Sequence, residues 1–268
     1  MTVITISRGT YSKGKEIAEK VAQKLDFECI ARKILLEASS EFNIPEIKLI
    51  RALHDSPSIF NRFTHGKEKY IAFIRHALLQ HLQKGNIVYH GLGGQFFLQN
   101  VSHVLRVRIT CDMEERVREE MKRENISENQ ARHLLAKDDE ERRKWSLFLY
   151  GIDTWDPLLY DITIHLDKLT VDDAVDMIAE VSKNPCFQKT TDSQSAFDDL
   201  LKAAKIQSLL IEKIPTASVT CKNGKIKIYF EGSFGQEDYI NTKIKEILRE
   251  IPGYNSADIE ILPIAAPK

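Results

Sequence analysis

The sequence has few cysteines and no surplus of either charge. Four cysteines are spread along 268 residues, and the formal net charge is −1 at pH 7. Balanced charge removes any general attraction to nucleic acid or to an anionic membrane, so we expect no nucleic-acid partner. None of the cysteines has the close spacing of a metal site. Reduced thiols, and therefore a cytoplasmic protein, are expected.

Long apolar segments and zinc-binding motifs are missing as well. No apolar stretch is long enough to span a bilayer, and a strand expected from residue 3 leaves no room for a signal peptide. The eight histidines form no HExxH or Cys/His pattern, so we predict no metal site in the protein. These absences argue against an integral membrane protein and a zinc enzyme.

The most informative feature that is present lies at the start of the chain. A strand-like segment, Val3-Ile4-Thr5-Ile6-Ser7, leads into Gly9-Thr10-Tyr11-Ser12-Lys13-Gly14-Lys15-Glu16. The second run fits the phosphate-binding pattern G-x-x-x-x-G-K-[ST] except at its last position, where Glu16 replaces a hydroxyl residue. In that pattern glycines let backbone N–H groups surround a phosphate, which the lysine also reaches. The run predicts nucleotide binding, and the alternative is a basic, solvated turn.

Strand-like and helix-like segments alternate over the first two thirds of the chain. Strands are predicted at 27–30, 86–90, 104–110 and 162–166, and helices at 17–25, 32–42, 45–53, 67–83, 113–125, 127–145 and 171–182. This order predicts an α/β fold, a parallel sheet with helices on both faces. Ligands in such folds bind beyond the carboxyl ends of the strands, where the glycine loop and the turn at 91–94 both lie.

The last third of the chain has a different pattern. Proline and hydroxyl residues predict a linker at 186–195 between two domains, residues 1–185 and 196–268. The second domain is expected to contain a helix at 197–213, a hairpin that turns at Asn223-Gly224, a helix at 236–251 and a strand at 258–262. This small α-β-β-α-β unit contains no cluster of residues typical of catalysis.

Residues 1–182 resemble the cytidylate kinase-like proteins, relatives of the bacterial nucleoside monophosphate kinases. The resemblance rests on the first strand and glycine loop, on Arg106-Val107-Arg108-Ile109, on Glu115-Arg116-Val117, on Ala131 followed by Asp139 and Arg142, and on Tyr160-Asp161. It implies a P-loop kinase-like domain that binds ATP and Mg²⁺. It also implies transfer of a phosphoryl group from ATP to a small-molecule acceptor such as a nucleoside monophosphate.

The resemblance implies roles for individual residues. Lys15, Arg116 and Arg142 would be catalytic, because they would stabilise charge on the transferred phosphoryl group. The nucleotide would be bound by Gly9, Thr10, Ser12, Lys13, Gly14, Lys15, Glu16, Arg123 and Arg143, and the acceptor by Arg32, Gly91 and Gly93. For the charged run at 137–143 the alternative is a solvated helix with i,i+4 ion pairs. The resemblance also implies that the two charged helices at 113–125 and 127–145 form a mobile lid. The aromatic residues Trp145, Phe148, Tyr150, Trp155 and Tyr160 are expected to pack in the core or in this lid, and the alternative is stacking on a base.

Departures from the family pattern favour a second hypothesis. Glu16, Ala31 and Leu92 stand where the family has other residues, which favours a catalytically weak or inactive nucleotide-binding sensor. Gly14-Lys15 and the lid arginines favour an enzyme. The tail from Phe197 resembles a BON domain, which implies an interaction module for lipid, for another ligand such as a protein, or for a second copy of the chain in a homo-oligomer.

Overall fold

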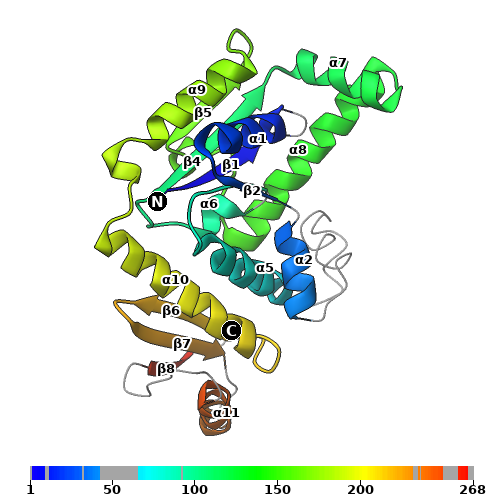
Figure 1. The fold of residues 1–268 in the computed structure, drawn as a ribbon. Helices are drawn as coiled ribbons and strands as arrows, with labels where there is room; N and C mark the ends of the chain where they lie inside the picture. Colours follow the sequence, from blue (N-terminus) through cyan, green and yellow to red (C-terminus); the bar gives the residue numbers. More distant parts are fainter. Residues whose placement is uncertain are drawn as a thin grey trace.

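The computed structural model describes residues 2–9, 12–31, 33–42, 66–91, 93–231, 235, 237–249 and 259–264. Within these ranges the chain forms two sheets, and the long helix α10 (Thr191–Leu210) lies between them (Figure 1). The helix predicted at 45–53 lies outside the described residues. None of the described helices combines the length and the apolar character needed to cross a membrane.

The larger sheet has five parallel strands in the order β2-β3-β1-β4-β5. The strands are β1 (Val3–Arg8), β2 (Glu28–Ile30), β3 (Ile87–His90), β4 (Val104–Cys111) and β5 (Ile162–Leu166). The first four residues of β1 are all buried, as expected for a central strand that is covered on both faces. The predicted α/β fold is therefore confirmed.

Helices cover both faces of this sheet. The described α-helices that precede α10 are α1 (Gly14–Leu25), α2 (Lys33–Glu41), α5 (Gly66–Leu82), α6 (Gly94–Phe97), α7 (Met113–Glu124), α8 (Glu128–Tyr150) and α9 (Val171–Ser182). On one face Ile4 and Ile6 pack with apolar residues of α1 and α9. On the other face Val3 packs with residues of α2, α5 and α10. The alternating sides of β1 thus contribute to two separate cores.

The smaller sheet has the order β6-β7-β8, and the predicted α-β-β-α-β sequence of elements is confirmed. Its parts besides α10 are β6 (Ser218–Lys222), β7 (Lys225–Glu231), α11 (Glu237–Arg249) and β8 (Ile259–Ile264). The antiparallel pair β6–β7 turns at Asn223 and Gly224, whose φ angles are 52° and 77°. Two positive φ angles define the type I′ turn that Asn-Gly favours.

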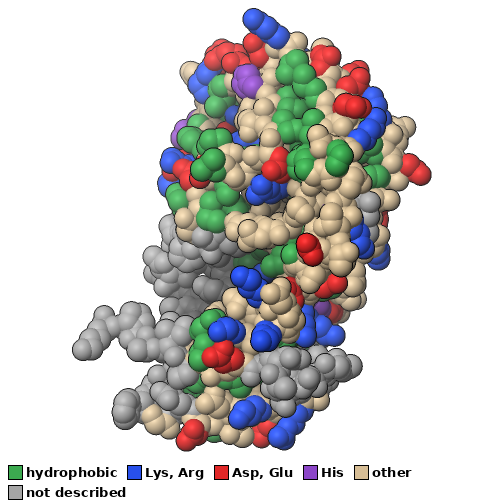
Figure 2. Space-filling model, turned by 90° about the vertical axis from the view of Figure 1, so that its left-hand side faces the viewer, with side chains coloured by type: hydrophobic (Ala, Val, Ile, Leu, Met, Phe, Trp, Pro, Cys, Tyr) green, Lys and Arg blue, Asp and Glu red, His purple; other side chains and the backbone are tan. Residues whose placement is uncertain are grey.

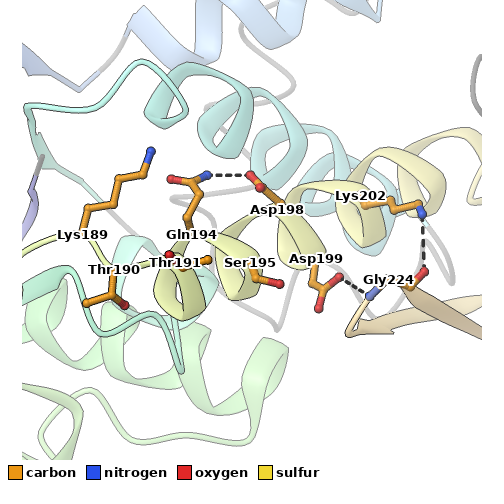
Figure 3. A pocket seen from close by; sticks show the side chains of 9 residues that line it. All are labelled: Lys189, Thr190, Thr191, Gln194, Ser195, Asp198, Asp199, Lys202 and Gly224. Carbon is orange, nitrogen blue, oxygen red and sulfur yellow. Dashed lines mark hydrogen bonds between the residues drawn. The ribbon is translucent and has the colours of Figure 1, made fainter.

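A carboxylate on α10 holds this hairpin turn in place (Figure 3). Asp199 accepts hydrogen bonds from the backbone N–H of Asn223 at 2.6 Å and of Gly224 at 2.9 Å. Lys202, one turn further along α10, donates to the Gly224 carbonyl at 3.4 Å. A cavity of ≈ 810 Å³ opens beside these contacts. Because the carboxylate of Asp199 is committed to the turn, we interpret it as a structural residue.

The second half of the predicted linker at 186–195 is wrong, because α10 already begins at Thr191. The Thr190 hydroxyl accepts from the Ser193 N–H at 3.1 Å, and the Ser193 hydroxyl accepts from the Thr190 N–H at 2.9 Å. This reciprocal pair is a capping box, so the hydroxyl residues that suggested a linker start a helix instead. The division into two domains at this point stays a prediction.

Helix α10 belongs to both cores. Phe197 and Ala204 lie in the core of the larger sheet, among residues of α2 and α5. Ala203, Ile206 and Leu210 lie in the core of the smaller sheet. A rigid helix with two apolar faces therefore joins the two units where a flexible connection was expected.

We expect Phe197→Ala to destabilise the larger unit by about 3–5 kcal/mol, because it leaves a cavity in that unit's core. Both tryptophans, Trp145 and Trp155, belong to the larger unit, so their fluorescence during urea unfolding measures its stability. Ser195→Ala, on the exposed side of the same helix, is the control and should change the free energy of unfolding by less than about 0.5 kcal/mol. Equal stability of the two variants would contradict the shared core.

Candidate active site

A cleft of ≈ 140 Å³ lies at the carboxyl ends of β1 and β4. Its walls come from these strands, from α6, α7 and α8, and from the segment that follows α8. The residues that line it are Ser7, Arg8, Gly9, Gln95, Phe96, Arg108, Thr110, Cys111, Arg116, Asp139, Arg142, Thr154 and Trp155. Carboxyl ends of parallel strands are the usual ligand-binding edge of such sheets.

The pairing of β1 with β4 places polar residues side by side at this edge. Ser7 is paired with Arg108 and Arg8 with Ile109. Among the described residues of the lining there are, with Arg116 and Arg142, four guanidinium groups and one carboxylate, that of Asp139. This composition fits an anionic ligand, and guanidinium groups match phosphate oxygens in particular.

Arg116 and Asp139 connect the two helices of the lid across the cleft. Arg116, only 6% exposed, donates to Asp139 Oδ2 at 2.7 Å. Gly9 lies beside the pair, since a Cβ atom there would be 3.9 Å from both Arg116 Cζ and Asp139 Oδ1. The carboxylate keeps a buried arginine oriented next to the phosphate-binding loop, and loss of either partner would leave a buried charge.

Two further arginines attach the lid to the sheet. Arg142 of α8 donates to the backbone carbonyl of Arg8 at 3.3 Å. Arg108 of β4 donates to the carbonyl of Thr154, in the segment after α8. The structure therefore brings together Gly9, Arg116 and Arg142, as the predicted site requires.

The described part of the glycine loop has the features of a phosphate-binding turn. Lys13 has a φ of 57° and directly precedes α1. Ser12 is fully buried, and its hydroxyl lies 3.0 Å from the Gly9 carbonyl and 3.2 Å from the Ile109 carbonyl. A Cβ atom on Gly14 would lie 2.7 Å from Arg8 Cβ, so only glycine fits there. Gly9, at the start of this loop, lines the cleft, and a helix N-terminus such as that of α1 favours an anion.

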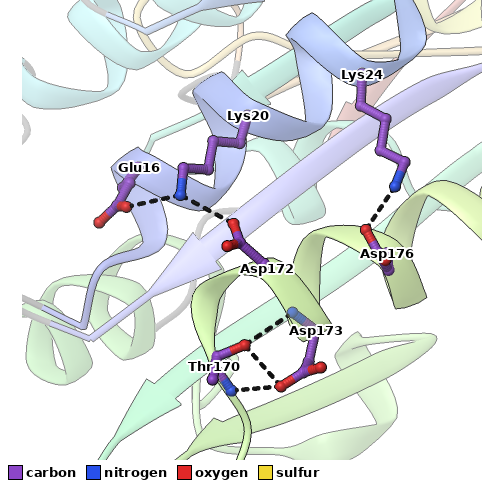
Figure 4. A network of polar contacts seen from close by, with 7 residues as sticks. All are labelled: Glu16, Lys20, Lys24, Thr170, Asp172, Asp173 and Asp176. Carbon is purple, nitrogen blue, oxygen red and sulfur yellow. Dashed lines mark hydrogen bonds and ion pairs between the residues drawn. The ribbon is translucent and has the colours of Figure 1, made fainter.

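Lys15 and Glu16 lie on the outer surface of α1. The Lys15 side chain is 64% exposed, and its Nζ lies 3.7 Å from Glu19 Oε1. Glu16 pairs with Lys20 at 3.2 Å, and Lys20 also pairs with Asp172 of α9 at 3.0 Å (Figure 4). The Glu16 carboxylate is therefore paired with a lysine of its own helix, which also pairs with α9. The catalytic role of Lys15 stays a prediction.

The other predicted residues are placed as follows. Arg123 pairs with Glu120 and Glu124 at the end of α7, and it does not line the cleft. Lys13 pairs with Glu115 at 3.4 Å. Gly91 follows β3, and Gly93, with a φ of 88°, precedes α6. Thr10, Arg32 and Leu92 lie outside the described residues, so the acceptor role of Arg32 stays a prediction.

Sequence patterns alone did not point to Arg8, Arg108, Asp139 and Trp155 as site residues. A usable signal was present for Arg8 and Arg108, because each follows apolar residues near the end of a parallel strand. Asp139 lies within a run of charged residues that also fits a solvated helix. Trp155 lies outside every helix and strand, so no periodicity indicates its direction.

The donor set fits a phosphate better than a protein-made metal site. No group of three or more His, Cys, Asp or Glu in the described ranges could hold a metal ion. Mg²⁺ commonly binds through phosphate oxygens, water and one or two carboxylates, and Asp139 is the carboxylate that the cleft offers. The expected ATP and Mg²⁺ are therefore compatible with this cleft if the metal arrives with the phosphates.

His90, at the end of β3, is a buried base near the glycine loop. It is 7% exposed, and no described group hydrogen-bonds its Nδ1 atom. Burial lowers the pKa of His90 to about 4, and the charges of Arg8 and Lys15 act in the same direction while Glu19 opposes them. The imidazole is therefore neutral at physiological pH.

The profile of the cytidylate kinase-like family matches residues 3–168. A cytidylate kinase from Staphylothermus marinus is 28% identical over 97 residues, or 36% of this chain and 54% of that protein. The chain thus spans about half the length of this curated relative. The structure of an uncharacterized protein from Eubacterium ventriosum superposes with a TM-score of 0.53 and 20% identity, over 69% of this chain and 99% of that one. The structure of a shikimate kinase from Bacteroides thetaiotaomicron superposes with a TM-score of 0.42 and 12% identity. The match covers 68% of this chain and 99% of that one.

Gly14→Ala should destabilise the protein by about 1–3 kcal/mol, because the new methyl group overlaps the backbone-proximal atoms of Arg8. Gly9→Ala is the matched control, since its methyl group would make only ordinary contacts. It should change stability by less than about 0.5 kcal/mol. Urea unfolding of both variants measures the difference, and equal losses would contradict the special role of Gly14.

Stability should decline as the pH falls from 6.5 toward 4, partly through His90. In this window His90 takes up a proton in the unfolded chain but stays neutral in the folded chain. Protonation therefore favours unfolding, and it lowers the free energy of unfolding by on the order of 2 kcal/mol. In His90→Gln the free energy of unfolding, measured in urea at pH 7 and pH 4.5, should decline less. The exposed His133, changed to Gln, is the control. An unchanged decline in His90→Gln would refute this expectation.

Proposed function

The chain belongs to the cytidylate kinase-like family, and on this basis we propose that it is a phosphotransferase. The proposed reaction transfers a phosphoryl group from ATP to a small phosphorylated acceptor such as a nucleoside monophosphate. One observation carries the proposal: four arginines converge on a cleft beside the glycine loop. Phosphoryl transfer depends mainly on positioning and charge stabilisation, which such a cleft supplies.

Each side of the cleft contributes a separate part of this function. The N-terminus of α1 holds donor phosphates, and ATP with Mg²⁺ supplies the reactive phosphoryl group when bound. Arg116, oriented by Asp139, and Arg142, anchored at the end of β1, neutralise the phosphates that meet in the cleft. Arg8 and Arg108 extend the positive surface along the sheet edge. The contacts of the lid to β1 and β4 limit the access of water to the reacting groups.

A second candidate function is a nucleotide-binding sensor with little or no turnover. The direction of Lys15 favours it, because this side chain pairs with Glu19 on the surface of α1. The continuity of α10 also favours it, since the shared helix could transmit a change in the larger unit to the smaller one. Under this function the C-terminal unit would be the output.

In either case we propose that the C-terminal, BON-like unit is an interaction module. Lys222, Lys225 and Lys227 of the hairpin line a cavity of ≈ 1050 Å³, which Gln99 and Asn100 of the larger unit also line. Figure 2 shows Lys and Arg side chains on one face at the height of this unit. The partner, a lipid, a protein or a second copy of the chain, and the cytoplasmic location stay predictions.

A panel of nucleoside monophosphates with ATP and Mg²⁺ tests the proposed reaction, with ADP formation as the measurement. Arg142→Gln should lower kcat by roughly 10²- to 10³-fold, because it removes one positioned donor for the transferred charge. Arg132→Gln, on the same helix and paired with Glu114 and Glu128, is the control and should retain activity. ATP binding without turnover on any acceptor would favour the sensor, and no ATP binding would reject both functions.

A further inference from the structure

Trp155 is a large aromatic side chain left exposed at the rim of the arginine cleft. It lines the cleft, yet 52% of its surface is accessible. Tyr160, from the same aromatic-rich segment, is buried as expected. Tryptophan is normally among the more buried residues, so its exposure beside a candidate binding site calls for an explanation.

The position of Trp155 is fixed by two charged residues. The Asp153 carboxylate accepts the Trp155 backbone N–H at 2.9 Å and pairs with Arg143 at 2.8 Å. The Arg143 guanidinium in turn lies 4.6 Å from the centre of the indole ring. This cation–π contact and the ion pair hold the ring in one orientation. The contacts that the structure gives Arg143 are with Asp153 and Trp155, and its predicted role in nucleotide binding stays a prediction.

The preceding residue is attached to the sheet. The Thr154 carbonyl accepts from Arg108 of β4 and, at 3.0 Å, from the Tyr160 hydroxyl. The Tyr160 hydroxyl also lies 3.2 Å from Ser7 Oγ of β1. The backbone that bears the indole is thus held directly at the carboxyl edge of the two strands. An exposed ring on a rigid support loses little conformational entropy when a ligand binds.

The size of the cleft indicates what the ring could contact. Pockets that enclose a drug-sized ligand measure roughly 300–1,000 Å³, whereas this cleft has ≈ 140 Å³. It can take a phosphate and its nearest atoms, and the arginines are suited to that group. The remainder of a nucleotide must then extend past the rim, where Trp155 offers an aromatic surface.

We propose that Trp155 is the stacking platform for the base of a phosphorylated nucleoside whose phosphate binds among the cleft arginines. Arg143 and Asp153 are positioning residues that hold the indole for this contact. This inference rests on the proposed function and specifies a part of its ligand: a planar ring attached to a phosphate. Because every base has an aromatic face, such a platform selects for the presence of a base more than for its identity.

Calorimetric titrations of four variants test the platform. Trp155→Ala should bind AMP and CMP about 5- to 150-fold more weakly than the wild type, while Trp155→Phe keeps most of the affinity. Ribose 5-phosphate, which lacks the base, should bind both variants like the wild type. The same comparison is made with ATP and tripolyphosphate. If Trp155→Ala weakens the binding of ATP but not of tripolyphosphate, the stacked base is that of the donor, and otherwise it is that of the acceptor. Arg143→Gln should lower the affinity only for the ligands that have a base, and Arg143→Lys should restore that affinity.

Fluorescence gives a measurement that does not depend on truncating the ring. The chain has two tryptophans, so Trp145→Phe leaves Trp155 as the single reporter. Its emission should be quenched by a nucleoside phosphate and unaffected by ribose 5-phosphate or tripolyphosphate.

Two results would contradict the platform without contradicting the proposed function. One is that Trp155→Ala loses the same affinity for ligands with a base and for ligands without one. The other is that Trp155→Ala binds all ligands as tightly as the wild type. Failure of the wild type to bind any of the phosphorylated ligands would instead reject the proposed function itself.

Discussion

The parallel pairing of β1 with β4 is the constraint on which the rest of the site depends. Its register brings Ser7 and Arg8 to the same edge as Arg108. Arg108 at this edge donates to the Thr154 carbonyl in the segment after α8, and the two helices α7 and α8 are themselves joined by the pair Arg116–Asp139. The lid in turn donates from Arg142 to the carbonyl of Arg8. The position of α8 over the sheet is therefore set by contacts with strand ends.

Much of the fold could be predicted because local patterns and tertiary structure agree. The buried run at the start of the chain is a strand, and Asn223-Gly224 forms the turn that its composition favours. The start of α10 was mislocated for a physical reason. Threonine and serine satisfy backbone groups in loops and at helix N-termini alike, so Thr190 and Ser193 could not distinguish a linker from a capping box.

The candidate site was predictable in its glycine loop and only partly in its side chains. The motif places Gly14 correctly, because the close approach of Arg8 excludes any larger residue. It does not specify the directions of Lys15 and Glu16, which pair with Glu19 and Lys20 of α1. The family resemblance groups Arg143 with Arg142 as lid arginines. Neighbouring helical positions point about 100° apart, and Asp153, which holds Arg143, lies in a segment without periodicity.

The two-sided packing of α10 has a consequence for synthesis on the ribosome. Phe197 and Ala204 complete the core around α5, yet they follow the last strand of the larger sheet by about thirty residues or more. A chain that grows from its N-terminus finishes that sheet before α10 is available. Until α10 emerges, the apolar face of α5 is open to water and to other chains. The nascent protein therefore passes through an interval in which its larger unit lacks part of its own core, and that interval ends only when the C-terminal part has been made.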